Sequence, residues 1–153
     1  MIVELGNVSV FKGLGDEVLG KISLFSTKME LDDGEILISE HQPGPSDIFA
    51  LSKGSVEIVS NDSSVTSNEV SLSKLDKDIF GEIGWLCSGH HSATVRSVGE
   101  IEIIRIDGNE LRKFIFDNPD IGFNIIYKMS QALAERLSTT DSLLKQVLWN
   151  AGY

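Results

Sequence analysis

The sequence predicts a mainly β domain with flanking helices, in which short strands build a sandwich, a barrel or a jelly roll. Between residues 27 and 106, apolar and polar side chains alternate and turn residues recur, which is typical of several short strands. On either side, in residues 8–26 and 107–149, apolar residues recur at helical spacing. Because 153 residues suit one domain, we expect a single domain over residues 1–153.

The first zone, residues 8–26, has the pattern of a short amphipathic helix. Asp16 and Glu17 stand where the positive end of a helix dipole favours acidic side chains. We therefore expect one short helical segment before the strands begin. The apolar residues of this pattern are Leu14, Val18, Leu19, Ile22 and Leu24.

The middle zone changes to a period of two. Residues 55–58 and 100–103 alternate polar and apolar side chains, and a second phase in residues 104–106 suggests a β-bulge. The polar, Ser-rich stretch between residues 60 and 73 is expected to be a hairpin loop without chemistry. Turns are expected at Asp33-Gly34, Pro43-Gly44-Pro45 and Lys53-Gly54.

The last zone, residues 107–149, is predicted to form two helices. Asp107 and Glu110 have the spacing of a capping box, which indicates the start of the first helix. Asn118 is expected to be the N-cap of a long second helix, with Pro119 at its first position.

One stripe of this long helix has the 3.5-residue spacing of a coiled-coil seam. Such a seam, about three heptads long, is more than a small domain usually buries alone. Two alternatives stay open: the helix folds back on its own sheet, or it pairs with the same helix of a second subunit in a homodimer. The seam consists of Ile126, Ser130, Leu133, Leu137, Thr140, Leu144 and Val147.

Charge and composition limit the classes of partner. The net charge of −10 disfavours nucleic acid and anionic membrane surfaces, so we expect neither as a partner. The single cysteine, Cys87, excludes a disulfide within the chain and agrees with a cytoplasmic location. We expect no signal peptide and no membrane span, because the first residues lack a basic start and apolar runs are short.

A Gly-Glu pair follows the apolar residues Ile79 and Phe80. Gly81 and Gly84 flank Glu82, so a strand is expected to end where one helical turn begins. Backbone N–H groups at such a turn can bind an anion, and the Glu82 carboxylate can accept a hydrogen bond from a neighbouring hydroxyl. An anion beside a hydroxyl describes a ribose phosphate. The alternative is that Glu82 only caps the backbone of its own turn.

The segment Phe80-Gly81-Glu82-Ile83, followed by Ser92-Ala93-Thr94-Val95, resembles the phosphate-binding cassette of cyclic nucleotide-binding domains. This resemblance to the family of catabolite activator and protein kinase A regulatory domains implies a β jelly roll with an N-terminal helical segment and a long C-terminal helix. It further implies a non-catalytic regulatory module that senses cAMP or cGMP and signals through its C-terminal helices to an unidentified protein partner. Matching segments are residues 10–14, 33–37, 51–56 and 118–120.

The resemblance also implies which residues bind the nucleotide. The family's cassette Gly and Glu contact the ribose 2′-hydroxyl, an Arg followed by a small residue binds the phosphate, and a helix Thr hydrogen-bonds adenine. In this chain a histidine stands where the family has that Arg. The implied nucleotide-binding residues are Gly81, Glu82, Ile83, His91, Ser92, Ala93 and Thr140.

The histidine at position 91 is the main departure from the family's pattern. A histidine offers one useful donor and is mostly neutral at pH 7, and losing a buried charged partner costs about 2–5 kcal/mol. Arg96 is no evident substitute, because on a regular strand it faces the other way from His91. Two outcomes stay open. The domain binds cyclic nucleotide weakly, and better at low pH, or it is a degenerate fold that serves as a dimerisation or docking module.

Enzymatic and metal-binding readings have little support in the sequence. Adjacent residues of a strand point to opposite faces, so His90 and His91 do not share a ligand direction, and His41 lies far along the chain. We therefore expect no metal site, no catalytic residue and no resident cofactor.

Overall fold

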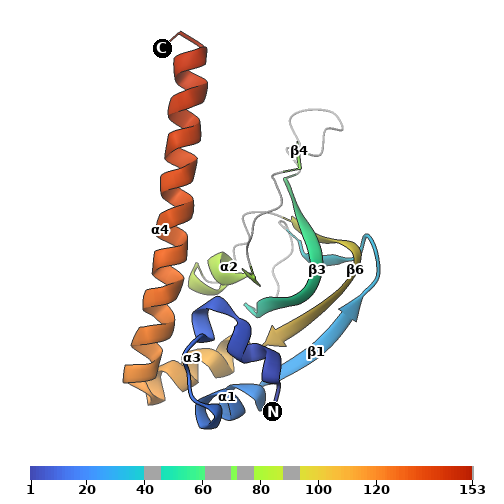
Figure 1. Cartoon of the computed structure of the whole chain (residues 1–153), viewed down its shortest axis with the longest axis vertical. Helices are drawn as coiled ribbons and strands as arrows, with labels where there is room; N and C mark the ends of the chain where they lie inside the picture. Colours follow the sequence, from blue (N-terminus) through green and yellow to red (C-terminus); the bar gives the residue numbers. More distant parts are fainter. Residues whose placement is uncertain (40–45, 61–69, 72–77, 88–93, 153) are drawn as a thin grey trace.

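The structure, a computed structural model, describes residues 1–39, 46–60, 70–71, 78–87 and 94–152 (Figure 1). Its helical elements are the 3₁₀-helices η1 (Val3–Asn7) and η2 (Ser9–Phe11) and the α-helices α1 (Asp16–Ser23), α2 (Glu82–Leu86), α3 (Gly108–Asp117) and α4 (Pro119–Asn150). The strands are β1 (Ser26–Leu31), β2 (Ile36–Ile38), β3 (Ile48–Ser60), β4 (Val70–Ser71), β5 (Ile79–Phe80) and β6 (Thr94–Ile106).

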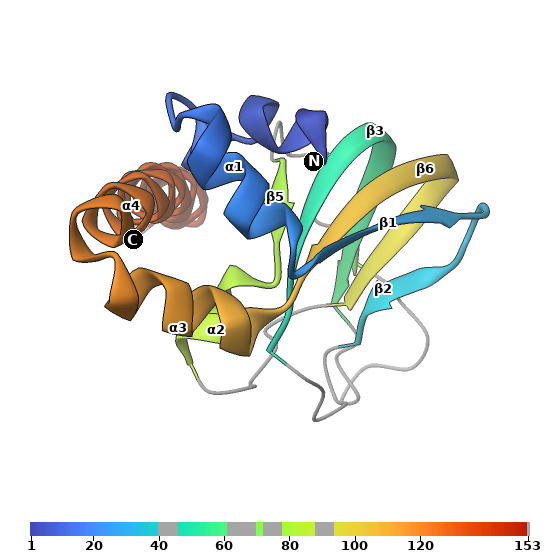
Figure 2. The ribbon, with the colours of Figure 1, turned by 90° about the horizontal axis from the view of Figure 1, so that it is seen from below.

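The strands form one antiparallel sheet centred on β3 and β6. These two strands pair from Ile48 opposite Ile106 to Val59 opposite Thr94. Strands β1 and β2 also pair with β6, while β4 and β5 pair with β3. Figure 2 shows the strands curving round on one side and helices α1, α3 and α4 gathered on the other. This arrangement is the predicted β jelly roll with flanking helices.

The phase change near the end of β6 has a different cause from the predicted bulge. The pairing of β6 with β1 continues without a shift from Ile101 to Ile106. Ile101 and Ile103 pack in one buried cluster with Phe80, whereas Ile104 and Ile106 pack in the other. The strand thus passes from one core to the other, and its apolar face changes with it.

The pairing of β3 with β6 is irregular instead on both sides of Lys53, between Leu51 and Ser55 of β3 and opposite residues 98–103 of β6. Lys53-Gly54 is therefore not the predicted turn between strands but part of a continuous strand. Gly54 has φ +96°, and a Cβ there would lie 2.7 Å from Cγ2 of Ile101. Only glycine suits this close approach. The turn at Asp33-Gly34 is confirmed, and Pro43-Gly44-Pro45 lies outside the described residues.

The larger core cluster joins the helices to the sheet. Phe11 and Ile22 from the N-terminal segment, Leu111 from α3 and Ile125 from α4 meet β-strand residues such as Ile104 in this cluster. The N-terminal helical segment is divided into η1, η2 and α1 instead of the one predicted helix, and α1 begins at Asp16 as its acidic residues indicate. Because Ile125 belongs to this core cluster, the start of α4 is fixed on the domain.

The junction of α3 and α4 confirms one predicted cap and corrects another. The Asp107 side chain accepts hydrogen bonds from the backbone N–H groups of Asn109 (2.9 Å) and Glu110 (3.0 Å). Asn118 precedes Pro119 as predicted, but its side chain makes no cap to α4. It donates instead to the Phe114 carbonyl and closes the end of α3 (2.9 Å).

Helix α4 is packed along its first part and exposed along the rest. Met129 is its last buried residue, and the helix then extends beyond the other elements (Figure 1). Ile126 and Leu133 of the predicted seam pack partly on the core, whereas Leu137, Leu144 and others are exposed. In the described part of the chain, no helix combines the length and apolarity that a membrane crossing requires.

Candidate functional site

Gly81 begins the site at the end of β5. Its φ of +86° is in the left-handed region, and it forms the N-cap of the short helix α2. A Cβ at this position would lie 2.6 Å from the Asp47 carbonyl oxygen. Glycine is required here both by the backbone conformation and by the neighbouring chain.

Glu82, the first residue of α2, is buried, with only 3% of its surface exposed. Its Oε1 atom lies 3.0 Å from Nη1 of Arg136 in α4. A buried carboxylate needs such a partner because removal from water is costly. The ion pair therefore joins the turn that begins at Gly81 directly to the long C-terminal helix.

Trp85 joins the same turn to α3. Its ring is buried, and its Nε1 donates to the Gly108 carbonyl at 2.8 Å. Arg112 donates in turn to the Trp85 carbonyl at 3.0 Å, and its guanidinium carbon lies 5.7 Å from the centre of the indole ring. Helix α2 thus contacts both C-terminal helices through specific side chains.

Asp47 connects the turn at Gly81 with β6 and α3. It is buried, and its Oδ2 lies 2.6 Å from Nε of Arg105, while its Oδ1 accepts from the Gly108 backbone N–H at 3.1 Å. Its carbonyl oxygen is the atom that faces Gly81. One residue thus positions the end of β6, the start of α3 and the turn at Gly81.

The structure brings only some of the predicted site residues together. Gly81, Glu82 and the half-buried Ile83 are consecutive at the start of α2. Thr140 is exposed and lies one turn beyond Arg136 on α4, where its hydroxyl donates to the Arg136 carbonyl at 2.9 Å. His91, Ser92 and Ala93, with His90 and His41, lie outside the described residues.

Arg96 has a partner of its own. Its guanidinium pairs with the Glu57 carboxylate of β3, with 2.5 Å between Nη2 and Oε1. Among the described residues, no cluster of His, Cys, Asp or Glu is suited to hold a metal ion.

Two residues of this site were missed by sequence reasoning. Arg136 precedes Thr140 by four residues, which on a helix places both on one face, and this spacing was available as a signal. Asp47 carried no signal, because an aspartate before an apolar run is also typical of an ordinary turn.

The turn, its buried carboxylate and the jelly roll agree with what a comparison of the sequence with protein families finds. The family described as "Cyclic nucleotide-binding domain" matches residues 28–118. The chain belongs to this family. The match includes Gly81 and Glu82 and ends where α4 begins.

Individual relatives are distant members of the same family. The chain is 21% identical over 145 residues to a "CRP-like cAMP-activated global transcriptional regulator" of Mycobacterium tuberculosis, covering 95% of this chain and 62% of that protein. It therefore spans about three-fifths of that relative's length. The net charge led us to expect no nucleic-acid partner. This relative is a transcriptional regulator, so it gives that expectation no support.

Solved structures share the fold. The catabolite activator protein of Thermus thermophilus has a TM-score of 0.74 at 20% identity, over 91% of this chain and 62% of that one. The regulatory domain of Toxoplasma gondii PKA with cAMP has a TM-score of 0.69 at 16% identity, over 86% of this chain and 48% of that one. At these identities the likeness shows the fold alone.

Proposed function

We propose that this chain is a non-catalytic cytoplasmic sensor of cyclic nucleotide. The family match and the position of Gly81 and Glu82 at the start of α2 support this proposal. The cyclic phosphate is bound by backbone N–H groups and His91, and the ribose 2′-hydroxyl by Glu82. The proposed binding residues are Gly81, Glu82, Ile83, His91, Ser92, Ala93 and Thr140.

The ion pair between Glu82 and Arg136 carries the proposal that binding is transmitted to α4. A ribose hydroxyl that donates to the Glu82 carboxylate competes with the Arg136 guanidinium for the same oxygens. Nucleotide binding therefore weakens the ion pair that holds α4 against the domain. The helix then takes a new position, and a partner protein senses this position. Trp85 and its contacts with α3 supply a second connection in the same direction.

Calorimetric titration with cAMP and cGMP at pH 6 and pH 7.5 tests this function. An unperturbed histidine side chain, with a reference pKa of about 6.5, is about three-quarters protonated at pH 6 and about one-tenth at pH 7.5. If only the protonated form binds the phosphate, affinity at pH 6 exceeds that at pH 7.5 by about eightfold. Binding weaker than millimolar at both pH values, for both nucleotides, would exclude the sensor.

The alternative is a degenerate domain that acts as a dimerisation or docking module. The histidine at position 91 favours it, because the phosphate then lacks the charged fork that arginine supplies. The calorimetric experiment separates the two functions directly, since a docking module has no nucleotide affinity to measure.

We propose a homodimer through α4 in either case. Beyond Met129 the described part of the helix buries no residue, while Leu137 and Leu144 are 63% and 54% exposed. These two residues and Val147, which is also exposed, belong to the predicted coiled-coil seam, with Thr140 between Leu137 and Leu144. Sedimentation equilibrium measures the dimer.

A further inference from the structure

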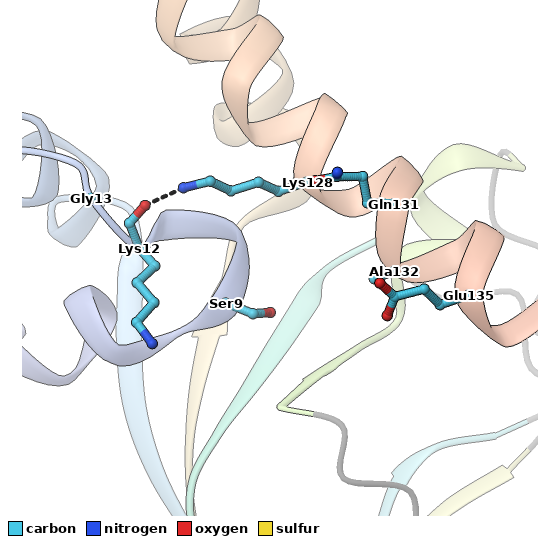
Figure 3. Close-up of a pocket in the computed structure, with 7 residues that line it drawn as sticks. All are labelled: Ser9, Lys12, Gly13, Lys128, Gln131, Ala132 and Glu135. Carbon is cyan, nitrogen blue, oxygen red and sulfur yellow. Dashed lines mark hydrogen bonds between the residues drawn. The ribbon is translucent and has the colours of Figure 1, made fainter.

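A cavity of about 470 Å³ lies between η2 and α4 (Figure 3). Ser9 and Lys12 line it from the N-terminal segment, and Lys128, Gln131 and Glu135 line it from α4. The volume lies in the range of small-molecule sites, about 300–1,000 Å³. Nothing in the proposed nucleotide site uses these residues.

The cavity has two lysine side chains at one side. Nζ of Lys128 donates to the Lys12 carbonyl oxygen, which holds the ammonium group between η2 and α4. An ammonium group has three donors, so two remain for another acceptor. Within the described parts of the chain, neither lysine is within ion-pair distance of a carboxylate.

The opposite side of the cavity is acidic. Figure 3 shows the Glu135 carboxylate across the cavity from Lys12 and Lys128, with Gln131 on the same helix. A carboxylate repels an anionic group and accepts hydrogen bonds from hydroxyl groups. The two sides therefore select a molecule with an anionic end and a hydroxyl-bearing end.

We propose that this cavity binds a small organic anion, whose phosphate or carboxylate group contacts Lys12 and Lys128 and whose hydroxyl groups face Glu135. Such a ligand contacts η2 and α4 together. The η2 side is tied to the strand that leads into Gly81, because Ser9 donates from its backbone N–H and its hydroxyl to Asp78 at 2.7 Å each.

The site is also compatible with the proposed homodimer. Lys128, Gln131 and Glu135 follow the i, i+3, i+7 pattern of one helix face. At about 100° per residue, this face lies well away from the one that carries Leu137 and Leu144. Pairing of two α4 helices thus leaves the cavity open, and the proposal stands whether or not cyclic nucleotide binds.

Titration of the full chain followed by amide NMR tests the proposal, with glycerol 3-phosphate and glycerate as probes. The two probes distinguish a phosphate from a carboxylate, and glycerol at matched ionic strength controls for the neutral part. We expect saturable shifts at Ser9 and Gln131 with at least one anion and none with glycerol. Lys12→Gln is expected to weaken binding by about fivefold or more, the loss of one charge-assisted contact.

Lys53→Gln is the matched control, because it removes the same charge from an exposed lysine that lies outside the cavity. It is expected to change the affinity less than about twofold. The proposal is overturned if neither anion gives saturable shifts, if glycerol gives the same shifts, or if the two lysine variants behave alike.

Discussion

Replacing Arg136 by methionine removes the cation that faces the buried Glu82 carboxylate, at 3.0 Å in the folded chain. Loss of one partner from a buried ion pair costs about 3–5 kcal/mol, because the remaining charge stays desolvated. The Arg136 side chain is 28% exposed, so water screens part of the pair. We therefore expect Arg136→Met to lower the free energy of unfolding by the smaller amount of about 2–3 kcal/mol.

A double-mutant cycle with Glu82→Gln isolates the pair from other effects of each substitution. Urea unfolding followed by circular dichroism gives the free energy of the parent, both single variants and the double variant. We expect a coupling energy of about 1–2 kcal/mol, since the double variant leaves no unpaired charge.

The exposed pair of Lys53 and Glu102, 3.5 Å apart, is the control for this cycle. The equivalent cycle with Lys53→Met and Glu102→Gln is expected to give less than about 0.5 kcal/mol, as surface pairs do. If the Glu82–Arg136 coupling is as small as that of the control, the pair does not hold α4 to the cassette. The proposed route from nucleotide to helix would then be refuted.

Three further substitutions test the rest of the reasoning. His91→Arg is expected to raise cAMP affinity about tenfold in calorimetry, because a permanent charged fork replaces a mostly neutral ring. Leu137→Glu is expected to convert the dimer to monomer in sedimentation equilibrium, since it places like charges in the seam. Gly81→Ala is expected to lower the unfolding free energy by about 3 kcal/mol, the sum of a left-handed backbone and an overpacked contact.

Each of these has a control or a contrary outcome. An unchanged affinity in His91→Arg would mean that the phosphate site differs elsewhere. Ser142→Glu adds the same charge on another face of α4 and should leave the dimer intact, so equal dissociation would contradict the seam. Gly34→Ala is the control for Gly81→Ala. Gly34 also has a positive φ, +80°, but a Cβ added there would have no neighbour within 4 Å. A loss equal to that of Gly81→Ala would mean that the Asp47 contact contributes nothing.

The alternation of period two and the helical spacing at both ends were sufficient to predict the order of elements. Local signals also placed Asp107 at a helix start and Asp33-Gly34 in a turn, because these features depend on neighbouring residues alone. Lys53-Gly54 has the same local signal as a turn, yet it lies within β3. Gly54 is needed because Ile101, which is distant in sequence, leaves no room for a Cβ at this position.

Contacts between distant segments also limited what could be predicted about the site. The Gly-Glu turn and the family's fold were predictable from the order of residues alone, because the turn needs a glycine at a left-handed position and the fold needs a particular series of strands. The burial of the Glu82 carboxylate against Arg136 and the contact between Asp47 and Gly81 were not predictable from the sequence. Partners for buried charges come from segments far apart in the chain, and only the folding of the whole domain brings them within hydrogen-bond distance.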